Sequence, residues 1–410
     1  MDITREPKGL LDKSSAISNR QLFFEHLAPT SLAPLALEIV KAEGCKLWDV
    51  DGKQYIDLIG GISVGNTGHR HPAVLKAIHQ QLDHYLHIMV FGELIQSPQT
   101  RYAQYLTSHL PGNLNCVFFT ASGTEATEGS MKLAKRFTGR SQIVAFKNSY
   151  HGSTQGALSI MGDEYWRNAY RPLLPDILHL DYNDFSQLQN ITENTACVIA
   201  ETIQAEAGVL PPVDGWLKAL RQRCSDTGVL LVLDEIQCGF GRNGTLWAFE
   251  QFDVVPDILL LGKALGGGMP LGAFVADKTL MQNFASNPVL GHINTFGGHP
   301  VCCAAGLASM QILIEENWID KVFEKGQLFK DLLIHQLIQN VSAKGLMISV
   351  RFKDHTQAKN VIDQLLLKGV FTDWFLFAPD CLRIAPPLII SPQEIETACK
   401  ILLNVLNEFS

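Results

Sequence analysis

The sequence predicts an α/β fold built on a mostly parallel β-sheet. From Asn115 onward, short apolar runs alternate with stretches of helical periodicity, which is typical of βαβ units. Two of these runs, residues 229–233 and 258–261, are apolar throughout, as expected of strands that are buried on both faces. Each run stops abruptly near a charged residue, the first at Asp234 and the second at Lys263.

The first part of the chain contains β-structure and one helix before the sheet begins. Residues 1–34 have no assignable pattern, whereas residues 37–58 read as strands with turns at Glu43-Gly44 and Asp51-Gly52. A Gly-rich loop then leads into a helix at about Pro72, where a first-turn proline is tolerated.

The middle and the tail of the chain differ in character. The strands expected in the sheet are residues 116–119, 142–146, 176–180, 196–201, 229–233 and 258–261. Beyond Pro300 a helix leads out of the sheet. The tail then becomes α+β, with a strand near residues 347–352, a helix around 357–367, a strand near 382–384 and a last helix from Pro392.

Length and charge limit the size and the partners of the protein. A chain of 410 residues exceeds what one hydrophobic core usually serves, and 46% apolar residues suffice for two domains. A net charge of -8 and a pI of about 5.9 argue against nucleic acid or an anionic membrane as partner. The expected ligands are therefore small molecules.

Cysteine usage and hydropathy indicate a cytoplasmic protein. The nine cysteines form no CxxC pair and include the adjacent Cys302 and Cys303, which fits neither a disulfide framework nor a zinc site. The first 20 residues lack the apolar core of a signal peptide, and no apolar run approaches about 18 residues. We therefore expect reduced thiols and no targeting or membrane segment.

The charged residues at the two strand ends predict a cofactor site. Ligands gather outside the carboxyl ends of strands in open α/β sheets, so Asp234 and Lys263 should face one crevice. The sequence around Lys263 is almost uncharged, and loss of water there should lower the pKa of its amine and favour Schiff-base formation. A buried carboxylate such as Asp234 suits a pyridinium nitrogen, so the predicted cofactor is pyridoxal phosphate. Taken singly, each residue could instead be a surface lysine or a helix cap.

A turn at Ser122, Gly123 and Thr124 predicts the phosphate site. It lies between an apolar strand and a helix, whose first N–H groups and positive dipole end attract anions. The same turn could be an ordinary helix cap. His69 and His71 invite a metal interpretation, which we do not favour because no third ligand lies near them in the sequence.

Two motifs together resemble a known family. LDEIQCGFGR, which contains Asp234 and Gln237, and LGKALGGGMPLGA, which contains Lys263, resemble the class III, or omega, aminotransferases among the fold-type I pyridoxal-phosphate enzymes. The resemblance implies that Asp234 binds the pyridine nitrogen, that Gln237 contacts the phenolic oxygen and that Lys263 carries the cofactor. It implies a large cofactor domain at residues 58–318 and a smaller domain from both termini, residues 1–57 and 319–410.

Further segments match the family's cofactor residues. In SYHGST, Tyr150 matches the aromatic residue that stacks on the ring, although a core tyrosine is the alternative. In HINTFGGHP, Thr295 matches a threonine that reaches the neighbouring subunit's phosphate, which implies a homodimer with shared active sites.

The resemblance also implies substrate-binding residues. Arg383 would bind a substrate carboxylate, and Glu206 would pair with Arg383 when no carboxylate is present. Glu201 is expected to act from behind the residues that touch the cofactor. By loop position alone, further pocket candidates are Ile62, Ser63, Met89, Phe91 and Trp166, for each of which a core role is equally plausible.

The activity implied is a ping-pong amino transfer from an amine or omega-amino acid to a 2-oxo acid. A decarboxylase or an aminomutase of the same family is the alternative, and a protein that binds the cofactor without catalysis is disfavoured by the full residue set. In the acetylornithine, ornithine and 4-aminobutyrate branches of the family, an arginine that binds the distal carboxylate of glutamate or 2-oxoglutarate stands where this chain has Ser153. One neutral hydroxyl cannot replace a bidentate guanidinium, so pyruvate should be the preferred acceptor unless Arg167 or Arg171 compensates.

Overall fold

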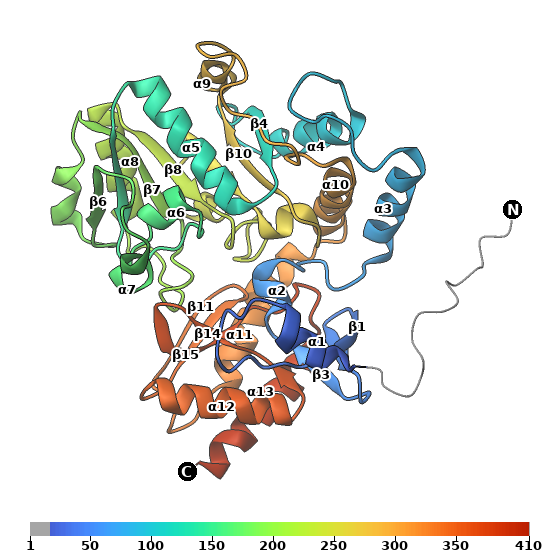
Figure 1. The fold of residues 1–410 in the computed structure, drawn as a ribbon. Helices are drawn as coiled ribbons and strands as arrows, with labels where there is room; N and C mark the ends of the chain where they lie inside the picture. The colour runs from blue at the N-terminus through green and yellow to red at the C-terminus, as the bar shows by residue number, and fades with distance from the viewer. Residues whose placement is uncertain (1–16, 410) are drawn as a thin grey trace, which may run out of the picture.

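The computed structural model describes residues 17–409, which form a larger and a smaller lobe (Figure 1). The larger lobe holds a seven-stranded sheet with helices around it, and the smaller lobe holds the first strands together with the last helices. The α/β class predicted from the alternating apolar runs is confirmed. Within the described residues, no helix has the length and apolar character needed to cross a membrane.

The large sheet is parallel except at one position. Its order is β4-β10-β9-β8-β7-β5-β6, and neighbouring strands from β6 to β9 run parallel. The strands are β4 (Cys116–Thr120), β5 (Gln142–Phe146), β6 (Ile177–Leu180), β7 (Thr195–Glu201), β8 (Leu230–Asp234), β9 (Ile258–Leu261) and β10 (Gly272–Ala276). The sequence interpretation missed β10, which pairs antiparallel with both β9 and β4.

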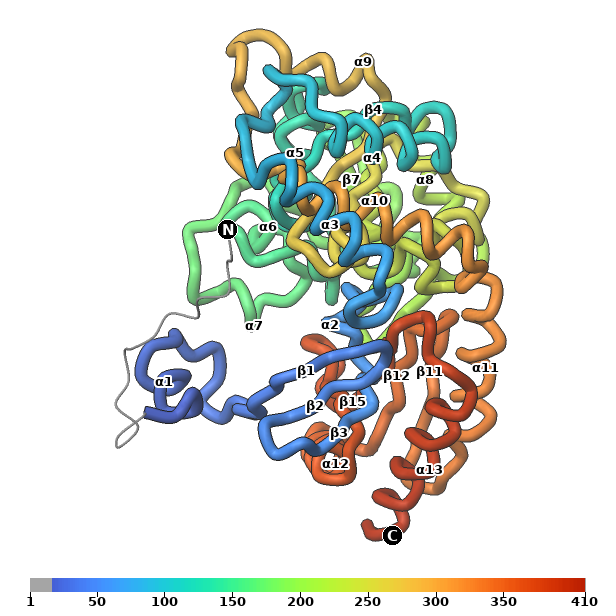
Figure 2. Tube along the Cα trace, turned by 90° about the vertical axis from the view of Figure 1, so that its right-hand side faces the viewer, coloured from blue at the N-terminus to red at the C-terminus, as the bar shows by residue number. Residues whose placement is uncertain are grey.

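The central strands are apolar because both faces of the sheet are covered. Every residue of β7 and of β9 is buried. Helix α5 (Gly123–Thr138) packs across one face, and α8 (Trp216–Thr227) lies close to β8. At the β4 end, α3 (Pro72–His84), α4 (Ser97–Thr107) and α10 (Pro300–Glu315) pack together (Figures 1 and 2).

The smaller lobe combines both ends of the chain. Strands β1 (Ile39–Glu43), β2 (Lys46–Asp49) and β3 (Gln54–Asp57) form a meander, and β13 (Val370–Phe371) adds to β3 in parallel. A second sheet contains β11 (Asn340–Lys344), β12 (Met347–Arg351), β15 (Ala378–Ile384) and β14 (Trp374–Phe375). Its helices are α11 (Val322–Leu332), α12 (His355–Leu367) and α13 (Pro392–Glu408). The division at residues 57 and 318 stays a prediction.

Part of the unassigned N-terminal segment is helical. Helix α1 (Asn19–His26) starts at a capping box formed by Ser18 and Gln21, and none of its residues is buried. It projects from the smaller lobe beside β1 (Figure 2). Residues 1–16, to which most of the expectation about targeting refers, lie outside the described part of the chain.

A buried arginine fastens the two lobes to each other. Arg242, in the loop after β8, donates to the carbonyls of Leu346 at 3.2 Å and Pro386 at 2.5 Å, and to Asn66 Oδ1 at 2.5 Å. Its side chain is fully buried, and burial lowers the pKa of its guanidinium to about 9. Through Arg242, the segments that contain Asn66, Leu346 and Pro386 are therefore held together.

We predict that Arg242→Ala lowers the free energy of unfolding by on the order of 3 kcal/mol, because it leaves three buried oxygens without donors. Urea denaturation followed by tryptophan fluorescence measures the loss. Arg351→Ala is the matched control, since Arg351 pairs with Asp380 at 2.6 Å but is 43% exposed, and it should cost about 0–1 kcal/mol. Equal destabilisation by both variants would contradict the fastening role.

Candidate active site

Side chains from the ends of five strands converge on one cavity of about 300 Å³ at the carboxyl edge of the large sheet. The five strands are β4, β5, β7, β8 and β9, which lie far apart along the sequence. The predicted site residues that line the cavity are Gly123, Thr124, Tyr150, Ser153, Glu201, Glu206, Asp234, Gln237 and Lys263. The crevice expected from the two strand ends is therefore present.

Asp234 ends β8 and is held by two donors. Its Oδ2 lies 2.7 Å from His151 Nδ1, and its Oδ1 accepts the backbone N–H of Ile236 at 2.9 Å. Because a carboxylate only accepts, His151 Nδ1 carries the proton of this contact. The opposite ring nitrogen, His151 Nε2, is buried without a partner among residues 17–409. Asp234 keeps lone pairs for one further donor.

Glu201 supports the loop that carries Tyr150. Its two carboxylate oxygens accept the backbone N–H groups of Tyr150 at 3.0 Å and Ala205 at 2.8 Å. Burial raises the pKa of Glu201 to about 7, and the neighbouring charges of His151 and Asp234 act in opposite directions on it. Glu201 thus holds the backbone of the loop in place, and it also lines the cavity, so its expected position behind the residues that touch the cofactor stays a prediction.

Lys263 is presented by a strained turn directly after β9. Its φ of 48° lies in the left-handed region, which is uncommon for a residue with a side chain, and it begins a short 3-10 turn. Removal from water lowers the pKa of the amine; the Glu206 carboxylate opposes this shift, and the Arg383 guanidinium adds to it. The lowered pKa expected from the uncharged sequence is therefore found, although charged groups from other strands surround the amine.

The start of α5 offers donors to an anion. Ser122 caps the helix through Glu125 N, and the backbone N–H groups of Gly123 and Thr124 find no acceptor in the described part of the chain. The Thr124 hydroxyl lies 2.7 Å from the Thr154 hydroxyl, which donates to Glu128 at 2.6 Å. This chain of hydrogen bonds fixes the rim of the cavity.

The loop after β5 closes tightly over α5 at Gly152. This glycine has φ 123°, and a Cβ there would lie 2.2 Å from Thr124 Oγ1 and 2.5 Å from Thr124 Cβ. Only glycine allows this close approach. Next to it, Ser153 lies within hydrogen-bond distance of the Tyr150 hydroxyl, at 3.1 Å.

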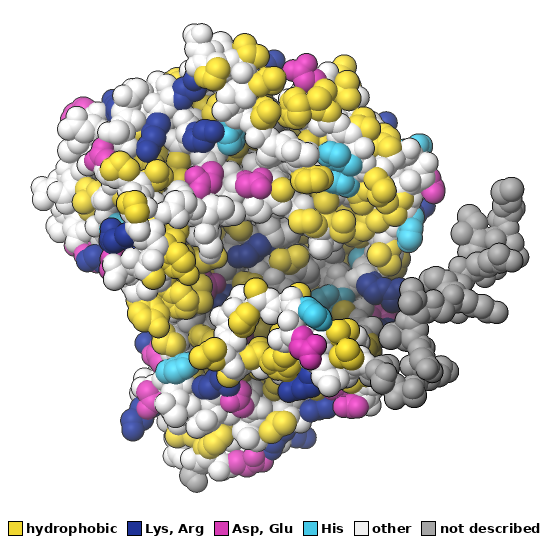
Figure 3. Space-filling view, in the orientation of Figure 1, with side chains coloured by type: hydrophobic (Ala, Val, Ile, Leu, Met, Phe, Trp, Pro, Cys, Tyr) yellow, Lys and Arg dark blue, Asp and Glu magenta, His cyan; other side chains and the backbone are white. Residues whose placement is uncertain are grey.

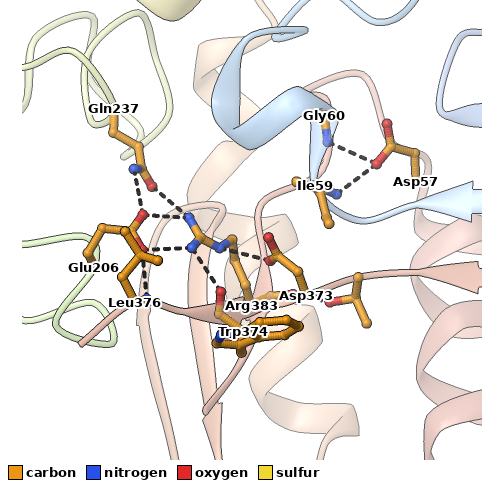
Figure 4. Close-up of polar contacts among 10 residues, drawn as sticks. Asp57, Ile59, Gly60, Glu206, Gln237, Asp373, Trp374, Leu376 and Arg383 are labelled. Carbon is orange, nitrogen blue, oxygen red and sulfur yellow. Dashed lines mark hydrogen bonds and ion pairs between the residues drawn. The ribbon is translucent and has the colours of Figure 1, made fainter. Parts of the chain in front are cut away.

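Arg383 joins the two lobes through a buried ion pair (Figure 4). It lies on β15 and donates from both terminal nitrogens to Glu206, with both distances 2.8 Å. Burial alone would raise the pKa of Glu206, but Arg383 outweighs burial and holds that pKa below its ordinary value. Gln237 contacts the same pair, donating to Glu206 at 3.3 Å and accepting from Arg383 at 3.4 Å. The predicted pairing of Glu206 with Arg383 is thus present.

A second cavity of about 290 Å³ adjoins the first and shares Tyr150, Glu206 and Lys263 with it. Ile62 lines it from the smaller lobe, held at φ 60° in a turn whose first N–H groups, of Ile59 and Gly60, bind Asp57 (Figure 4). Of the five pocket candidates, Ile62 alone lines either cavity. Phe91 lines a separate surface hollow, Ser63 is buried, and Met89 and Trp166 are exposed.

Arg167 and Arg171, the two arginines that could compensate for the serine at position 153, do not point to the cavity. Arg167 and Arg171 both bind Glu164 on the short helix α7 (Glu164–Arg167), and Arg167 also contacts His179. Neither lines the two cavities. Around Ser153 the described part of the rim therefore offers neutral hydroxyl groups, those of Ser153 and Tyr150, and neither of the two arginines.

Thr295 lies away from the cavity of its own chain. It is exposed, in the segment that precedes α10, and does not line either cavity. Its proposed role therefore requires a second subunit.

His69 and His71 have structural partners. His69 Nε2 lies 2.7 Å from Asp57 Oδ2, and His71 Nδ1 accepts from Ala73 N at the start of α3. In the described residues no three His, Cys, Asp or Glu side chains are grouped to hold a metal ion.

The sequence interpretation missed several groups at this site. His151 stands beside Tyr150 in the quoted motif, but its contact with Asp234 spans 83 positions. Asp373, which pairs with Arg383 at 2.9 Å, carries no local pattern. Glu235, whose pKa burial raises to about 7, lines neither cavity and accepts from the backbone N–H groups of Ala248 and Phe249.

The donor set fits a phosphorylated pyridine aldehyde. Lys263 supplies an amine of lowered pKa, Asp234 a carboxylate with free lone pairs, and α5 two unengaged N–H groups, all on one cavity. The orphaned His151 Nε2 lies on the same wall. The amine, the carboxylate and the N–H groups are the three kinds of contact that such a cofactor requires.

Comparison with known proteins agrees with this site. The sequence pattern of the family described as aminotransferase class-III matches residues 28–406. The acetylornithine aminotransferase of Methanopyrus kandleri is 39% identical over 93% of this chain and 96% of its own length. The [LysW]-aminoadipate semialdehyde/glutamate semialdehyde transaminase of Sulfurisphaera tokodaii is 36% identical, over 88% and 92%. A solved structure of the Toxoplasma gondii ornithine aminotransferase, with partial occupancy of PLP at its active site, has a TM-score of 0.87, 27% identity and coverage of 94% and 93%.

We expect Gly152→Ala to weaken binding of pyridoxal phosphate at least about tenfold, because the new methyl group collides with Thr124. Fluorescence titration of the apoprotein measures the affinity. Gly139→Ala is the control, since Gly139 has φ 70° but a methyl group added there would meet no atom within 4 Å; it should cost stability only. Unchanged affinity in Gly152→Ala would contradict the proposed cradle.

Proposed function

Since the chain belongs to the class-III aminotransferases, we propose that it moves an amino group from an amine or omega-amino acid to a 2-oxo acid in two half-reactions, with pyruvate favoured over 2-oxoglutarate. The observation that carries the proposal is the shared cavity wall on which Lys263, Glu206 and Arg383 meet. The two successive substrates, an amine and an acid, carry opposite charges. The site offers one reactive amine, Lys263, and one guanidinium, Arg383, that can exchange Glu206 for a substrate carboxylate.

The cofactor of the family is pyridoxal 5'-phosphate. When bound, it supplies an aldehyde that takes up the amino group and a ring that delocalises the electron pair left on the substrate carbon. In this chain Lys263 would hold the aldehyde, the first turn of α5 would hold the phosphate, and Asp234 would hold the pyridine nitrogen.

Lys263 is proposed as the proton carrier. Burial lowers the pKa of its amine and so favours the uncharged form, which can accept a proton at Nζ from the substrate carbon. The same Nζ atom would then deliver this proton to the cofactor. The strained backbone at φ 48° aims the side chain into the cavity.

Asp234 and His151 are proposed to keep the ring nitrogen protonated. The Asp234 carboxylate is buried and is held by His151 at 2.7 Å and Ile236 N at 2.9 Å. It is therefore already oriented to accept a hydrogen bond from the protonated ring nitrogen. Preorganised charge of this kind is the largest contribution to catalysis in many enzymes.

Arg383 is proposed to bind the carboxylate of the 2-oxo acid in place of Glu206. Both ligands are carboxylates that use two parallel N–H···O bonds, so the incoming acid can replace Glu206 without leaving the guanidinium unpaired. Breaking the buried pair without a replacement would be costly. Glu206 then excludes solvent from Arg383 until an acid arrives.

Ser153 supports pyruvate as the acceptor. Its hydroxyl offers one neutral hydrogen bond, and Arg167 and Arg171 are occupied by Glu164. Among residues 17–409 the second carboxylate of 2-oxoglutarate would therefore find no cation at this rim, at a cost of several kcal/mol. Smaller acceptors avoid that cost.

The donor is proposed to carry its reacting amine at the end of a flexible chain. Relatives named for acetylornithine and for aminoadipate semialdehyde support this class. A decarboxylase or aminomutase remains the alternative, and a panel of amines with pyruvate or 2-oxoglutarate, assayed for both new amino acid and CO2, separates the three.

A homodimer with shared sites is also proposed. Exposed apolar side chains gather over α3 and the loop that follows it (upper right in Figure 3). They are Leu82, Leu86, Ile88, Met89, Leu94 and Ile95. Phe91 and Asn294 line one hollow, so this surface continues into the segment of Thr295. A continuous apolar face of this kind is typical of an interface between subunits.

Lys263→Ala should still bind pyridoxal phosphate but without a covalent bond. Borohydride reduction followed by peptide mapping should label Lys263 in the native enzyme and no residue in the variant. Lys325→Met is the control, because burial also lowers the pKa of Lys325 to about 8 although it donates to Leu388 O outside the cavity. A label on any lysine other than Lys263 would refute the assignment.

Ser153→Arg should narrow the preference for pyruvate, because the guanidinium supplies the missing cation for a second carboxylate. In the native enzyme we expect kcat/KM for pyruvate to exceed that for 2-oxoglutarate by on the order of 100-fold. Steady-state rates with one amine donor and each acid measure both values. A native preference for 2-oxoglutarate would show that another residue, in this subunit or its partner, compensates.

A further inference from the structure

Two carboxylates share one guanidinium in the cavity of about 290 Å³ beside Lys263. Asp373, in the loop between β13 and β14, pairs through Oδ1 with Arg383 Nε at 2.9 Å, on the side opposite to Glu206 (Figure 4). The Asp373 side chain is 27% exposed and lines the cavity.

Both terminal nitrogens of the guanidinium are fully used, whereas Nε makes no hydrogen bond within residues 17–409 although it lies 2.9 Å from Asp373 Oδ1. The terminal nitrogens donate to Glu206, to Gln237 Oε1 and to the Trp374 carbonyl at 3.0 Å, and Nε faces Asp373. Arg383 therefore contributes one positive charge against two negative charges. The Oδ2 atom of Asp373 has no partner within residues 17–409, and the side chain is 27% exposed in a partly open cavity, so this oxygen is accessible to a ligand.

The backbone at Asp373 is held against β15. Its backbone carbonyl accepts from Arg383 N at 2.8 Å, and the hydroxyl of the preceding residue, Thr372, donates to Arg383 O at 2.5 Å. The loop is thus fastened to β15 on both sides of the carboxylate. A cationic group of a ligand is the missing partner.

We propose that Asp373 binds the distal ammonium of a donor that has two amino groups, while the other amine reacts at Lys263, so that diamines and basic amino acids are preferred over monoamines. The inference rests on the proposed amino transfer and names its donor class. Ile62 and Trp374, which line the same cavity, offer apolar contacts to the methylene chain between the two amines.

The two half-reactions would then use different groups of one cavity. The diamine places its second ammonium beside Asp373, whereas the 2-oxo acid replaces Glu206 at Arg383. Burial raises the pKa of Asp373 to about 6, and Arg383 opposes the shift, so the carboxylate is ionised at pH 8 and available to a cation.

The test compares two donors of equal length, 1,5-diaminopentane and 1-aminohexane, in which a methyl group replaces the second ammonium. With native holoenzyme, pyruvate and pH 8, kcat/KM for the diamine should be at least about tenfold higher, the size expected for a hydrogen bond to a charged group. Asp373→Asn should lower the diamine value about 10- to 100-fold and change the monoamine value less than about threefold.

Asp380→Asn is the matched control. Asp380 also pairs with an arginine from the same sheet, Arg351 at 2.6 Å, and its side chain is 24% exposed, but it does not line the cavity. Both donors should react with this variant as with the native enzyme.

Two results would overturn the inference without affecting the proposed amino transfer. One is equal native rates with both amines. The other is an equal loss of both rates in Asp373→Asn, which would mean that Asp373 only positions Arg383. Conversion of neither amine with either 2-oxo acid would overturn the inference, and failure of omega-amino acid donors as well would refute the proposed amino transfer. A diamine preference that is lost in Asp373→Asn and kept in Asp380→Asn supports the assignment.

Discussion

The ion pair between Glu206 and Arg383 joins the two lobes on the wall of the cavity that also contains Lys263. Glu206 belongs to the loop after β7 of the large sheet, and Arg383 belongs to β15 of the smaller lobe. Both side chains are almost fully buried, so separating them without a new partner would leave an uncompensated charge out of water. In the proposed function a substrate carboxylate would take the place of Glu206, so the contact that joins the two lobes would also select the acceptor.

Burial sets the chemistry of the groups around this pair. Removal from water lowers the pKa of Lys263 and raises the pKa values of Glu201 and Glu235 to about 7, so the amine and both acids are less charged than they would be in solvent. Arg383 acts against burial on Glu206 and keeps it ionised. Groups of one chemical type are thereby driven to different protonation states, as the division of labour in acid–base catalysis requires.

The sequence predicted those features that depend on local patterns. Short, wholly apolar runs identified the buried parallel strands, and the charged residues after them identified Asp234 and Lys263. The strand β10 was missed because GAFVA directly follows a Gly-rich loop, and nothing in its composition shows an antiparallel direction. The pairing of β13 with β3 joins residues more than 300 positions apart, which no local pattern reveals. His151 and Asp373 were missed for the same reason, since their importance lies in distant partners.

The central claim is that one amino group is stored on the enzyme between two substrates. The most direct measurement mixes holoenzyme with a small excess of amine donor in the absence of any 2-oxo acid, and counts the carbonyl product and CO2 per active site. An aminotransferase releases about one carbonyl product per site, stops, and forms alanine when pyruvate is added. Continuous turnover without an acceptor, or release of CO2, would contradict the account and favour a mutase or a decarboxylase.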